Sequence, residues 1–165
     1  MKLRRLLVLS SLVLAVAALS PAAALGATQG TARPLKGTST ATAVVDTAAG
    51  TGTVDGAILF TQLGKGTYHT DLTGFTSTGN TFAFGGTATF VAANGDKVFT
   101  TIAGTGTVTS TGSESTTVDT ITGGTGRFAD ASGTFTLTNV GATVSTVGSI
   151  VTQRLTGTVV GEISY

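Results

Sequence analysis

The sequence predicts an all-β protein: a closed antiparallel β-barrel of about eight strands that follows a cleaved N-terminal signal peptide. After the N-terminal segment, apolar and polar residues alternate with a period of two in many successive runs, and no window has the i, i+3, i+4, i+7 apolar spacing of a helix. Short segments that contain Gly or Asn separate these runs, as expected for antiparallel strands joined by tight turns. Closure into a barrel is favoured because it removes the unpaired edges of an open sheet; a two-sheet sandwich is the alternative.

The first 27 residues have the three-part layout of a secretory signal peptide. Basic residues at Lys2, Arg4 and Arg5 precede an apolar run, and small residues follow Pro21. The apolar run, residues 6–19, has about 14 residues and is shorter than the roughly 20 that span a bilayer, so we expect it to be removed rather than kept as an anchor. We therefore expect a secreted protein that has no membrane contact after removal of the signal.

The rest of the chain is predicted to consist of a flexible segment at 28–36 and a single β-barrel domain at 37–165. The sequence contains no cysteine, so disulfides and lipid attachment to a cysteine are excluded. Loss of the three basic residues of the signal changes the formal net charge from +1 to −2. A basic surface of the kind that binds nucleic acid is therefore not expected.

The alternating runs predict the individual strands. The clearest alternation lies at 150–163, where Val151 and Ile163 belong to an apolar face and threonines and charged residues occupy the other face. The run at 81–92 is predicted to have a phenylalanine-rich face. The expected strands lie at 39–46, 53–62, 67–75, 81–92, 97–108, 115–122, 132–140 and 150–163, with a short additional piece at 143–147.

Turn chemistry predicts how these strands connect. Asn94-Gly95, between two apolar strands, predicts a type I′ hairpin, because this pair tolerates the positive φ that such a turn requires at both central residues. The segments 78–80 (Thr-Gly-Asn) and 64–66 (Gly-Lys-Gly) are predicted to be further turns.

The most distinctive run in the chain is TITGGTGRFADASGTF. A phosphate-binding P-loop would continue with Gly-Lys-Ser or Gly-Lys-Thr and a helix, whereas here Arg127 and Phe128 are followed by an alternating strand. We therefore expect Gly123, Gly124 and Gly126 to supply positive φ at a corner between two strands. The alternative is a small backbone nest that binds an anion.

The same run resembles the Gly-Gly-Thr-Gly-x-Phe-x-x-Ala-x-Gly signature of the dirigent and allene oxide cyclase barrel superfamily, and AANGDKVF, earlier in the chain, resembles a hairpin of its small exported bacterial members. The resemblance implies an eight-stranded antiparallel barrel with a ligand cavity at its mouth, and a trimer in the plant members. It places none of that superfamily's catalytic groups on a matching motif here. The residues that match the signature, which we predict to be a structural turn motif, are Gly123, Gly124, Thr125, Gly126, Phe128, Ala131 and Gly133.

His69 and Asp71 are the candidate catalytic pair. His69 is the only histidine, and it shares a strand face with Asp71, whose carboxylate could orient the imidazole for acid–base chemistry. The alternative is a solvated pair on the barrel surface. One histidine without any cysteine does not form a usual zinc or copper site, and the aspartates lack the spacing of a calcium loop, so we expect neither a metal nor a cofactor.

Three functions fit these features. Binding of a small hydrophobic ligand without catalysis is the function that we favour, because the sequence shows no complete catalytic set. The alternatives are an exported structural or surface-interaction protein and, from the resemblance, an isomerase or cyclase. Segment 57–60 (Ala-Ile-Leu-Phe) is apolar on both faces, and a small barrel buries only one face, so we also expect a homo-oligomer, which by the resemblance is a trimer.

N-terminal sequencing of the protein from culture supernatant tests the predicted signal. We expect the mature chain to begin within a few residues of Ala27 and to be soluble without detergent, because the apolar segment at 6–19 is then absent. Mature protein that still contains residues 6–19 would contradict this prediction.

Overall fold

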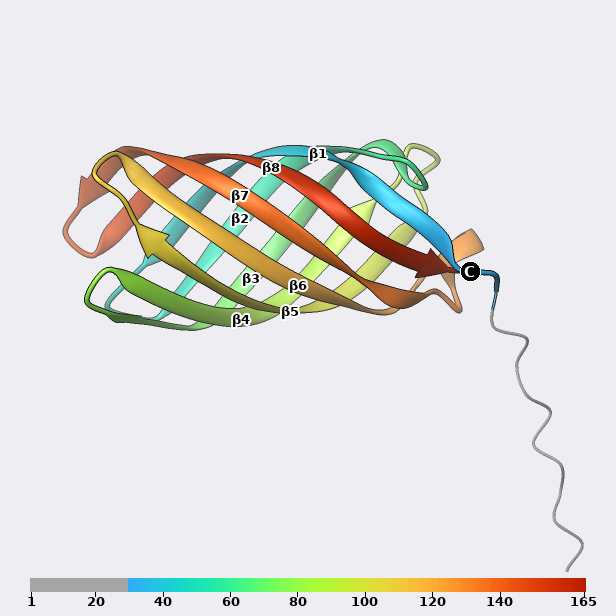
Figure 1. Cartoon of the computed structure of the whole chain (residues 1–165), viewed down its shortest axis with the longest axis horizontal. Helices are drawn as coiled ribbons and strands as arrows, with labels where there is room; N and C mark the ends of the chain where they lie inside the picture. The colour runs from blue at the N-terminus through green and yellow to red at the C-terminus, as the bar shows by residue number, and fades with distance from the viewer. Residues whose placement is uncertain (1–29) are drawn as a thin grey trace, which may run out of the picture.

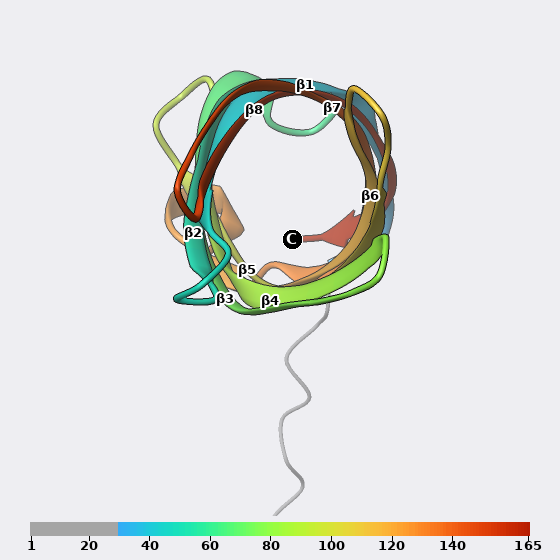
Figure 2. The ribbon, with the colours of Figure 1, turned by 90° about the vertical axis from the view of Figure 1, so that its left-hand side faces the viewer.

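In a computed structural model that describes residues 30–165, the chain forms one closed barrel of eight antiparallel strands (Figure 1). The strands are β1 (Arg33–Asp46), β2 (Thr51–Phe60), β3 (Gly64–Thr78), β4 (Thr81–Val91), β5 (Lys97–Val108), β6 (Gly112–Gly124), β7 (Ser132–Val147) and β8 (Ile150–Ser164). Each strand pairs with the next, and β8 pairs with β1, so the ring is complete when seen end-on (Figure 2). The predicted closed barrel is confirmed and the sandwich alternative is wrong, while the signal peptide predicted at 1–27 lies outside the described residues.

Several strands extend beyond the predicted ranges, because backbone pairing continues past the clearest side-chain alternation. Segment 143–147, expected as a separate short strand, is the second half of β7 and pairs with β8. Residues 33–36, expected in the flexible segment, belong to β1, where Arg33 pairs with Ile163 and Leu35 is buried. The barrel therefore begins within the segment that was predicted to be flexible.

The predicted hairpin between β4 and β5 is confirmed, but its predicted turn type is wrong. A type I′ turn needs positive φ at both central residues, and among the described residues only glycines have positive φ. The N–H of Gly95 donates to the carbonyl of Ala92 at 2.9 Å, and the N–H of Ala92 donates to the carbonyl of Asp96 at 2.8 Å. With φ of +88° at Gly95, the connection is a three-residue loop in which a tight turn is followed by a left-handed glycine.

The other two predicted turns have different outcomes. Gly79 has φ of +59° between β3 and β4, so the turn predicted at 78–80 is confirmed. The turn predicted at 64–66 lies instead at 61–63. Lys65 already pairs with Leu59 of β2, because the β2–β3 ladder begins at the glycine that ends the turn.

Alternation along the strands separates a dry interior from a threonine-rich exterior. In β2, Ile58 and Phe60 are buried, whereas Leu59 between them is 61% exposed. In the half of the barrel near the chain termini, the rings of Phe60, Phe90 and Phe135 pack with centroids 5.5 to 6.3 Å apart and fill the interior. The homo-oligomer that was inferred from two-faced apolar strands stays a prediction.

A plug made of Gln62, Arg127, Phe128 and Tyr165 seals this end of the barrel. A single 3₁₀ turn, η1 (Gly126–Phe128), buries Phe128 and sets its ring edge-on to Tyr165 at 4.8 Å. The Arg127 guanidinium lies over the Phe128 ring at 4.6 Å and donates a hydrogen bond to the carbonyl of Gln62. The plug thus joins the β6–β7 connection, the β2–β3 turn and Tyr165.

Within residues 30–165, no helix is long and apolar enough to cross a membrane.

The glycine-rich run leads into this plug. Gly123 and Gly126 have the positive φ that the sequence predicted (+134° and +57°), whereas Gly124 does not. Gly124 is constrained by space instead, because a Cβ there would collide with the backbone of β5. The Asp96 carboxylate accepts a hydrogen bond from the N–H of Arg127 at 3.2 Å and lies against Gly126. The alternative for this corner was a backbone nest that binds an external anion. The Asp96 carboxylate occupies that place instead.

Substitution of Gly126 tests the left-handed backbone at the plug. Gly126→Ala should lower the free energy of unfolding by about 1 kcal/mol or more, because alanine is strained at positive φ and its Cβ would displace the Asp96 carboxylate. Gly85→Ala is the matched control: this strand glycine lacks positive φ and has room for a Cβ, so a change within about 0.5 kcal/mol is expected. Denaturant unfolding measures both values, and equal effects would contradict the assignment.

Candidate functional site

A cavity of about 720 Å³ occupies the half of the barrel opposite the plug. Its mouth is bordered by the β1–β2 and β5–β6 turns, which contribute Thr47 and residues 109–111. Side chains from every strand line the cavity, so the site exists only in the closed barrel. The volume lies within the range of small-molecule pockets, roughly 300 to 1,000 Å³.

One side of the cavity is an aromatic wall that comes from β3 and β4. Its members are Tyr68, Phe75, Phe82, Phe84 and Phe90. The ring of Phe82 stacks on that of Phe75 at 5.4 Å and on that of Phe84 at 6.1 Å. Two glycines of β5, Gly104 and Gly106, leave the space that these rings occupy, because a Cβ at either position would collide with Phe84 or Phe82. The wall is therefore shaped by rings that lie against bare backbone.

The facing side comes from β6, β7 and β8 and combines the apolar residues Leu137, Val151 and Leu155 with a group of polar residues that we call the polar wall. Its members are Ser113, Ser115, Thr117, Asp119, Asn139 and Gln153. Ser113 Oγ donates to Gln153 Oε1 at 2.8 Å, and Thr117 Oγ1 donates to the carbonyl of Leu137 at 3.2 Å. Asn139 Oδ1 is buried and has no hydrogen-bond partner among the described residues. The cavity is thus amphipathic and suits a ligand that is apolar on one side and polar on the other.

Asp119 is the only carboxyl group among the described residues that line the cavity, and only 2% of its surface is exposed. Its Oδ1 accepts a hydrogen bond from Thr100 Oγ1 at 3.0 Å, and its cross-strand neighbours are Ile102 and Phe135. No Lys, Arg or His lines this described cavity to balance a negative charge. Burial raises the pKa of the Asp119 carboxyl to about 7, and the Thr100 hydrogen bond opposes the shift. A large fraction of Asp119 is therefore protonated at neutral pH.

Tyr68 is the other ionisable group that lines the cavity. Burial raises the pKa of its phenol to about 12, while a hydrogen bond with Ser39 acts in the opposite direction. The phenol is therefore uncharged at neutral pH, and its ring stacks on Phe90 at 5.4 Å. Among the described lining residues, Asp119 is thus the one group that can gain or lose a proton near neutrality.

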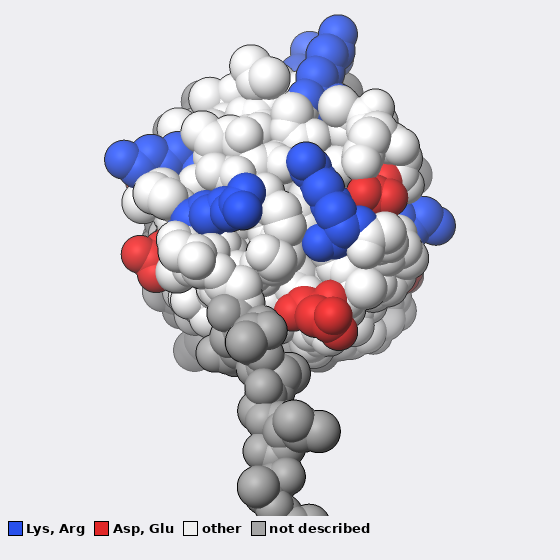
Figure 3. Space-filling model, turned by 90° about the vertical axis from the view of Figure 1, so that its right-hand side faces the viewer, with Lys and Arg blue, Asp and Glu red and all other residues white. Residues whose placement is uncertain are grey.

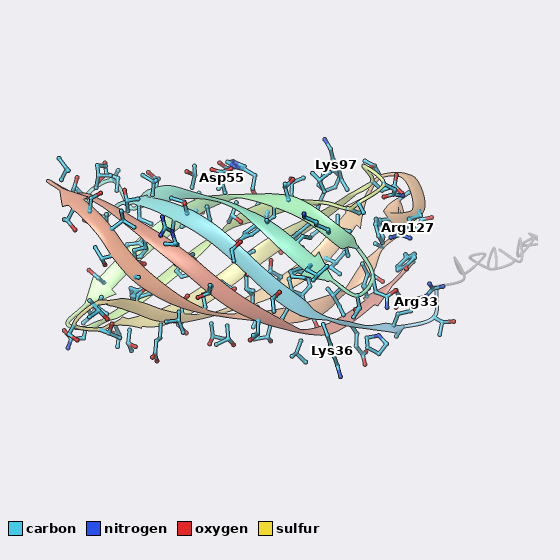
Figure 4. All side chains as sticks on the ribbon, turned by 90° about the horizontal axis from the view of Figure 1, so that it is seen from above. Arg33, Lys36, Asp55, Lys97 and Arg127 are labelled. Atoms are coloured by element: carbon cyan, nitrogen blue, oxygen red, sulfur yellow. The ribbon has the colours of Figure 1, made fainter. Side chains whose placement is uncertain are left out.

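The predicted catalytic pair lies on the outer wall and not in the cavity. His69 Nε2 is 3.3 Å from Asp71 Oδ1, His69 Nδ1 is 2.6 Å from Asp55 Oδ1, and all three side chains are exposed. The hydrogen bond to Asp55, and to a lesser degree that to Asp71, raises the pKa of the His69 imidazole. Tyr68 and Thr70 point inward, so alternation along β3 directs His69 outward. Figure 4 shows Asp55 on the outside of the barrel.

Two residues of these clusters were not found from the sequence. From the sequence, Asp119 was only one of the aspartates that lack the spacing of a calcium loop, although it is in phase with Thr117 and Ile121, which are also buried. A carboxyl group in phase with buried strand positions is a signal for a functional group. Asp55 was missed because its contact with His69 depends on the β2–β3 register, in which the two residues are directly opposite.

Basic side chains gather at the plug end of the barrel, away from the cavity mouth (Figure 3). Arg33, Lys36, Lys97 and Arg127 all lie at that end in Figure 4. Since none of them lines the cavity, none can balance a negative charge on Asp119.

Within residues 30–165, no group of three or more His, Cys, Asp or Glu side chains is arranged to hold a metal ion.

No protein-family model, curated protein or solved structure matches the chain. The resemblance to the dirigent and allene oxide cyclase superfamily therefore stays a prediction that rests on the glycine motif. The residues of that motif, from Gly123 to Gly133, lie at and next to the plug and do not line the cavity.

The raised pKa of Asp119 predicts that the fold is more stable in mild acid than in mild base. Between the ordinary value of 3.8 and about 7, the folded chain binds more protons than the unfolded chain, so stability falls as pH rises through this window. We expect the free energy of unfolding at pH 5 to exceed that at pH 8 by on the order of 2 kcal/mol. Asp119→Asn should remove most of this difference.

Denaturant unfolding at the two pH values measures the effect. The raised pKa of His69 acts in the same direction, but His69 is retained in Asp119→Asn, so the comparison of wild type with this variant isolates Asp119. An unchanged pH dependence in the variant would contradict the prediction.

Proposed function

We propose that the protein is exported and holds a small hydrophobic ligand in the barrel cavity without converting it. The observation that supports the proposal is the cavity: the interior is packed with rings near the plug, and about 720 Å³ remain open in the other half. Contact with the aromatic wall would remove apolar ligand surface from water, at roughly 25 cal/mol per Å². Export is supported by the signal-like N-terminal sequence.

Inward glycines let neighbouring side chains of the open half lie close to the barrel wall. Gly104, Gly106, Gly141 and Gly157 all lie where a Cβ would meet side chains of the interior. Unfilled volume in a protein core costs stability, so a barrel with a purely structural role gains from larger side chains at the positions that line the cavity. The cavity therefore favours a binding role over the alternative of an exported structural or surface-interaction protein.

One observation favours a second candidate function, an isomerase or cyclase that works by acid catalysis. Asp119 lies in the cavity and is partly protonated at neutral pH, as a general acid must be. Such a reaction also needs a group that takes a proton from the substrate. Tyr68, the other ionisable group among the described lining residues, titrates far above neutrality. Binding without turnover is therefore the function that we propose.

Binding of Nile red, an uncharged apolar dye, tests the proposal. Ser115 lines the cavity and Thr116 beside it faces outward, so Ser115→Trp fills cavity space and Thr116→Trp is the matched control. We expect the wild type and Thr116→Trp to enhance and blue-shift the dye fluorescence to the same extent. Ser115→Trp should weaken binding at least about tenfold.

Purified protein that fails to bind the dye, or equal binding by the two tryptophan variants, would contradict a cavity site. Circular dichroism of each variant checks that the barrel is intact.

A further inference from the structure

We propose that Asp119 donates a hydrogen bond to the ligand, so that the cavity selects uncharged apolar molecules with an acceptor group, such as a carbonyl, and rejects carboxylates. This inference rests on the proposed binding function and names the chemical class of its ligand. It is carried by the charges, the hydrogen bonds and the position of Asp119 in the cavity.

The described part of the cavity lining has no positive charge that could balance a ligand carboxylate. Among the described residues, those that line the cavity include one carboxyl group and no Lys, Arg or His. A ligand carboxylate would lose its hydration without gaining a cation, and it would lie in the same apolar enclosure as Asp119. Arg33, Lys36, Lys97 and Arg127 lie at the plug end, outside the cavity (Figure 4). The cavity therefore disfavours anionic amphiphiles such as fatty acids.

The surroundings of Asp119 favour its protonated form and leave that proton free for a ligand. Its Oδ1 accepts from Thr100 Oγ1 at 3.0 Å, and no hydrogen bond joins its other oxygen to a described residue. Ile102 on β5 and Phe135 on β7 flank it, and Tyr68 on β3 is the one ionisable group that faces it across the cavity. A carboxyl group in such surroundings is favoured in its neutral form, which carries one O–H donor. That donor has no described acceptor in the protein and is available to a ligand.

Asp119 lies at the inner end of the cavity, far from the mouth. Along β6, Ser113 and Ser115 are nearest the mouth, and Asp119 lies four residues beyond Ser115, roughly 13 Å further along the strand. Ile121, the next inward residue, is part of the packed core. A ligand that enters with its acceptor group first would therefore place this group at the inner end of the cavity and its apolar body against the aromatic wall.

The pH dependence of binding follows from this assignment. Loss of the Asp119 proton removes the donor and places a negative charge beside the ligand acceptor. The pKa of Asp119 is raised to about 7 by burial, so the preference for an acceptor-bearing ligand should be present at pH 6 and lost at pH 8.5.

Displacement of Nile red by three naphthalenes with the same ring body tests the inference. The competitors are 2-acetylnaphthalene, which has a carbonyl, 2-ethylnaphthalene, which has no acceptor, and 2-naphthoate, which is an anion. At pH 6 the wild type should bind the acetyl compound about fivefold more tightly than the ethyl compound, as one neutral hydrogen bond allows. At pH 8.5 this ratio should fall to about one, and 2-naphthoate should be the weakest competitor at both pH values.

Three variants assign the effect to Asp119. Asp119→Asn keeps a donor at all pH values, so the acetyl preference should persist at pH 8.5. Asp119→Leu removes the donor, so the preference should be absent at both pH values while the ethyl compound still binds. Asp71→Asn changes an exposed aspartate of the outer wall and should behave as the wild type. If Asp119→Leu does not fold, the contrast between Asp119→Asn and the wild type decides.

The possible outcomes separate the inference from the function on which it rests. If neither Nile red nor any naphthalene binds to the wild type, both are wrong. If 2-ethylnaphthalene binds and the acetyl compound is not preferred at pH 6, or its preference survives in Asp119→Leu, binding stands and the role of Asp119 is wrong. Tight binding of 2-naphthoate would likewise overturn the inference alone.

Discussion

The pairing of β1 with β8 is the constraint on which the rest of the structure depends. The two strands pair along the whole of β1, from Arg33 opposite Ile163 to Asp46 opposite Ile150. A closed barrel of eight strands has a narrow interior that receives one face of every strand. The size of the inward side chains then decides, level by level, whether the interior is filled. Phenylalanine rings fill the plug end, whereas in the other half the rings of Phe82 and Phe84 lie against glycines of β5 and a cavity remains.

The interior also changes in polarity along the barrel axis. β6 shows the change within one strand, since its inward residues run from Ser113 near the mouth through Thr117 and Asp119 to the buried Ile121. Hydroxyl groups near the mouth can form hydrogen bonds to water. A charged group further in is shielded from water by the packed side chains around it. Asp119 lies where the polar wall of the cavity meets the packed core, and burial at this position raises its pKa.

The fold class and the strand runs could be predicted from the sequence because both depend on local signals. Alternation marks each strand, and glycine marks most corners. The turn type at Asn94-Gly95 could not be predicted, because the same two residues also fit a longer loop in which only the glycine is left-handed. The start of β1 at Arg33 was missed for a different reason: its partner, Ile163, lies at the far end of the chain.

The cavity could not be predicted because its volume depends on register. Phe82 faces Gly106 and Phe84 faces Gly104 across the β4–β5 ladder, and a shift of the ladder by two residues would set other side chains opposite these rings. The same holds for the outer cluster, where Asp55 meets His69 only through the β2–β3 pairing. The sequence shows which residues of a strand share a face. Which residue of the next strand lies opposite each of them depends on the register of the assembled sheet.

The closing ladder has a consequence for biosynthesis. β8, the outer partner of β1, is synthesised after the other seven strands of the barrel, and the plug is complete only once Tyr165 is in place. Pairings this distant in sequence form slowly, so the outer edge of β1 stays unpaired until β8 has been made. An open edge invites pairing with other nascent chains. The arrangement that leaves the finished ring without an edge thus leaves the unfinished polypeptide with an exposed one until β8 pairs with β1.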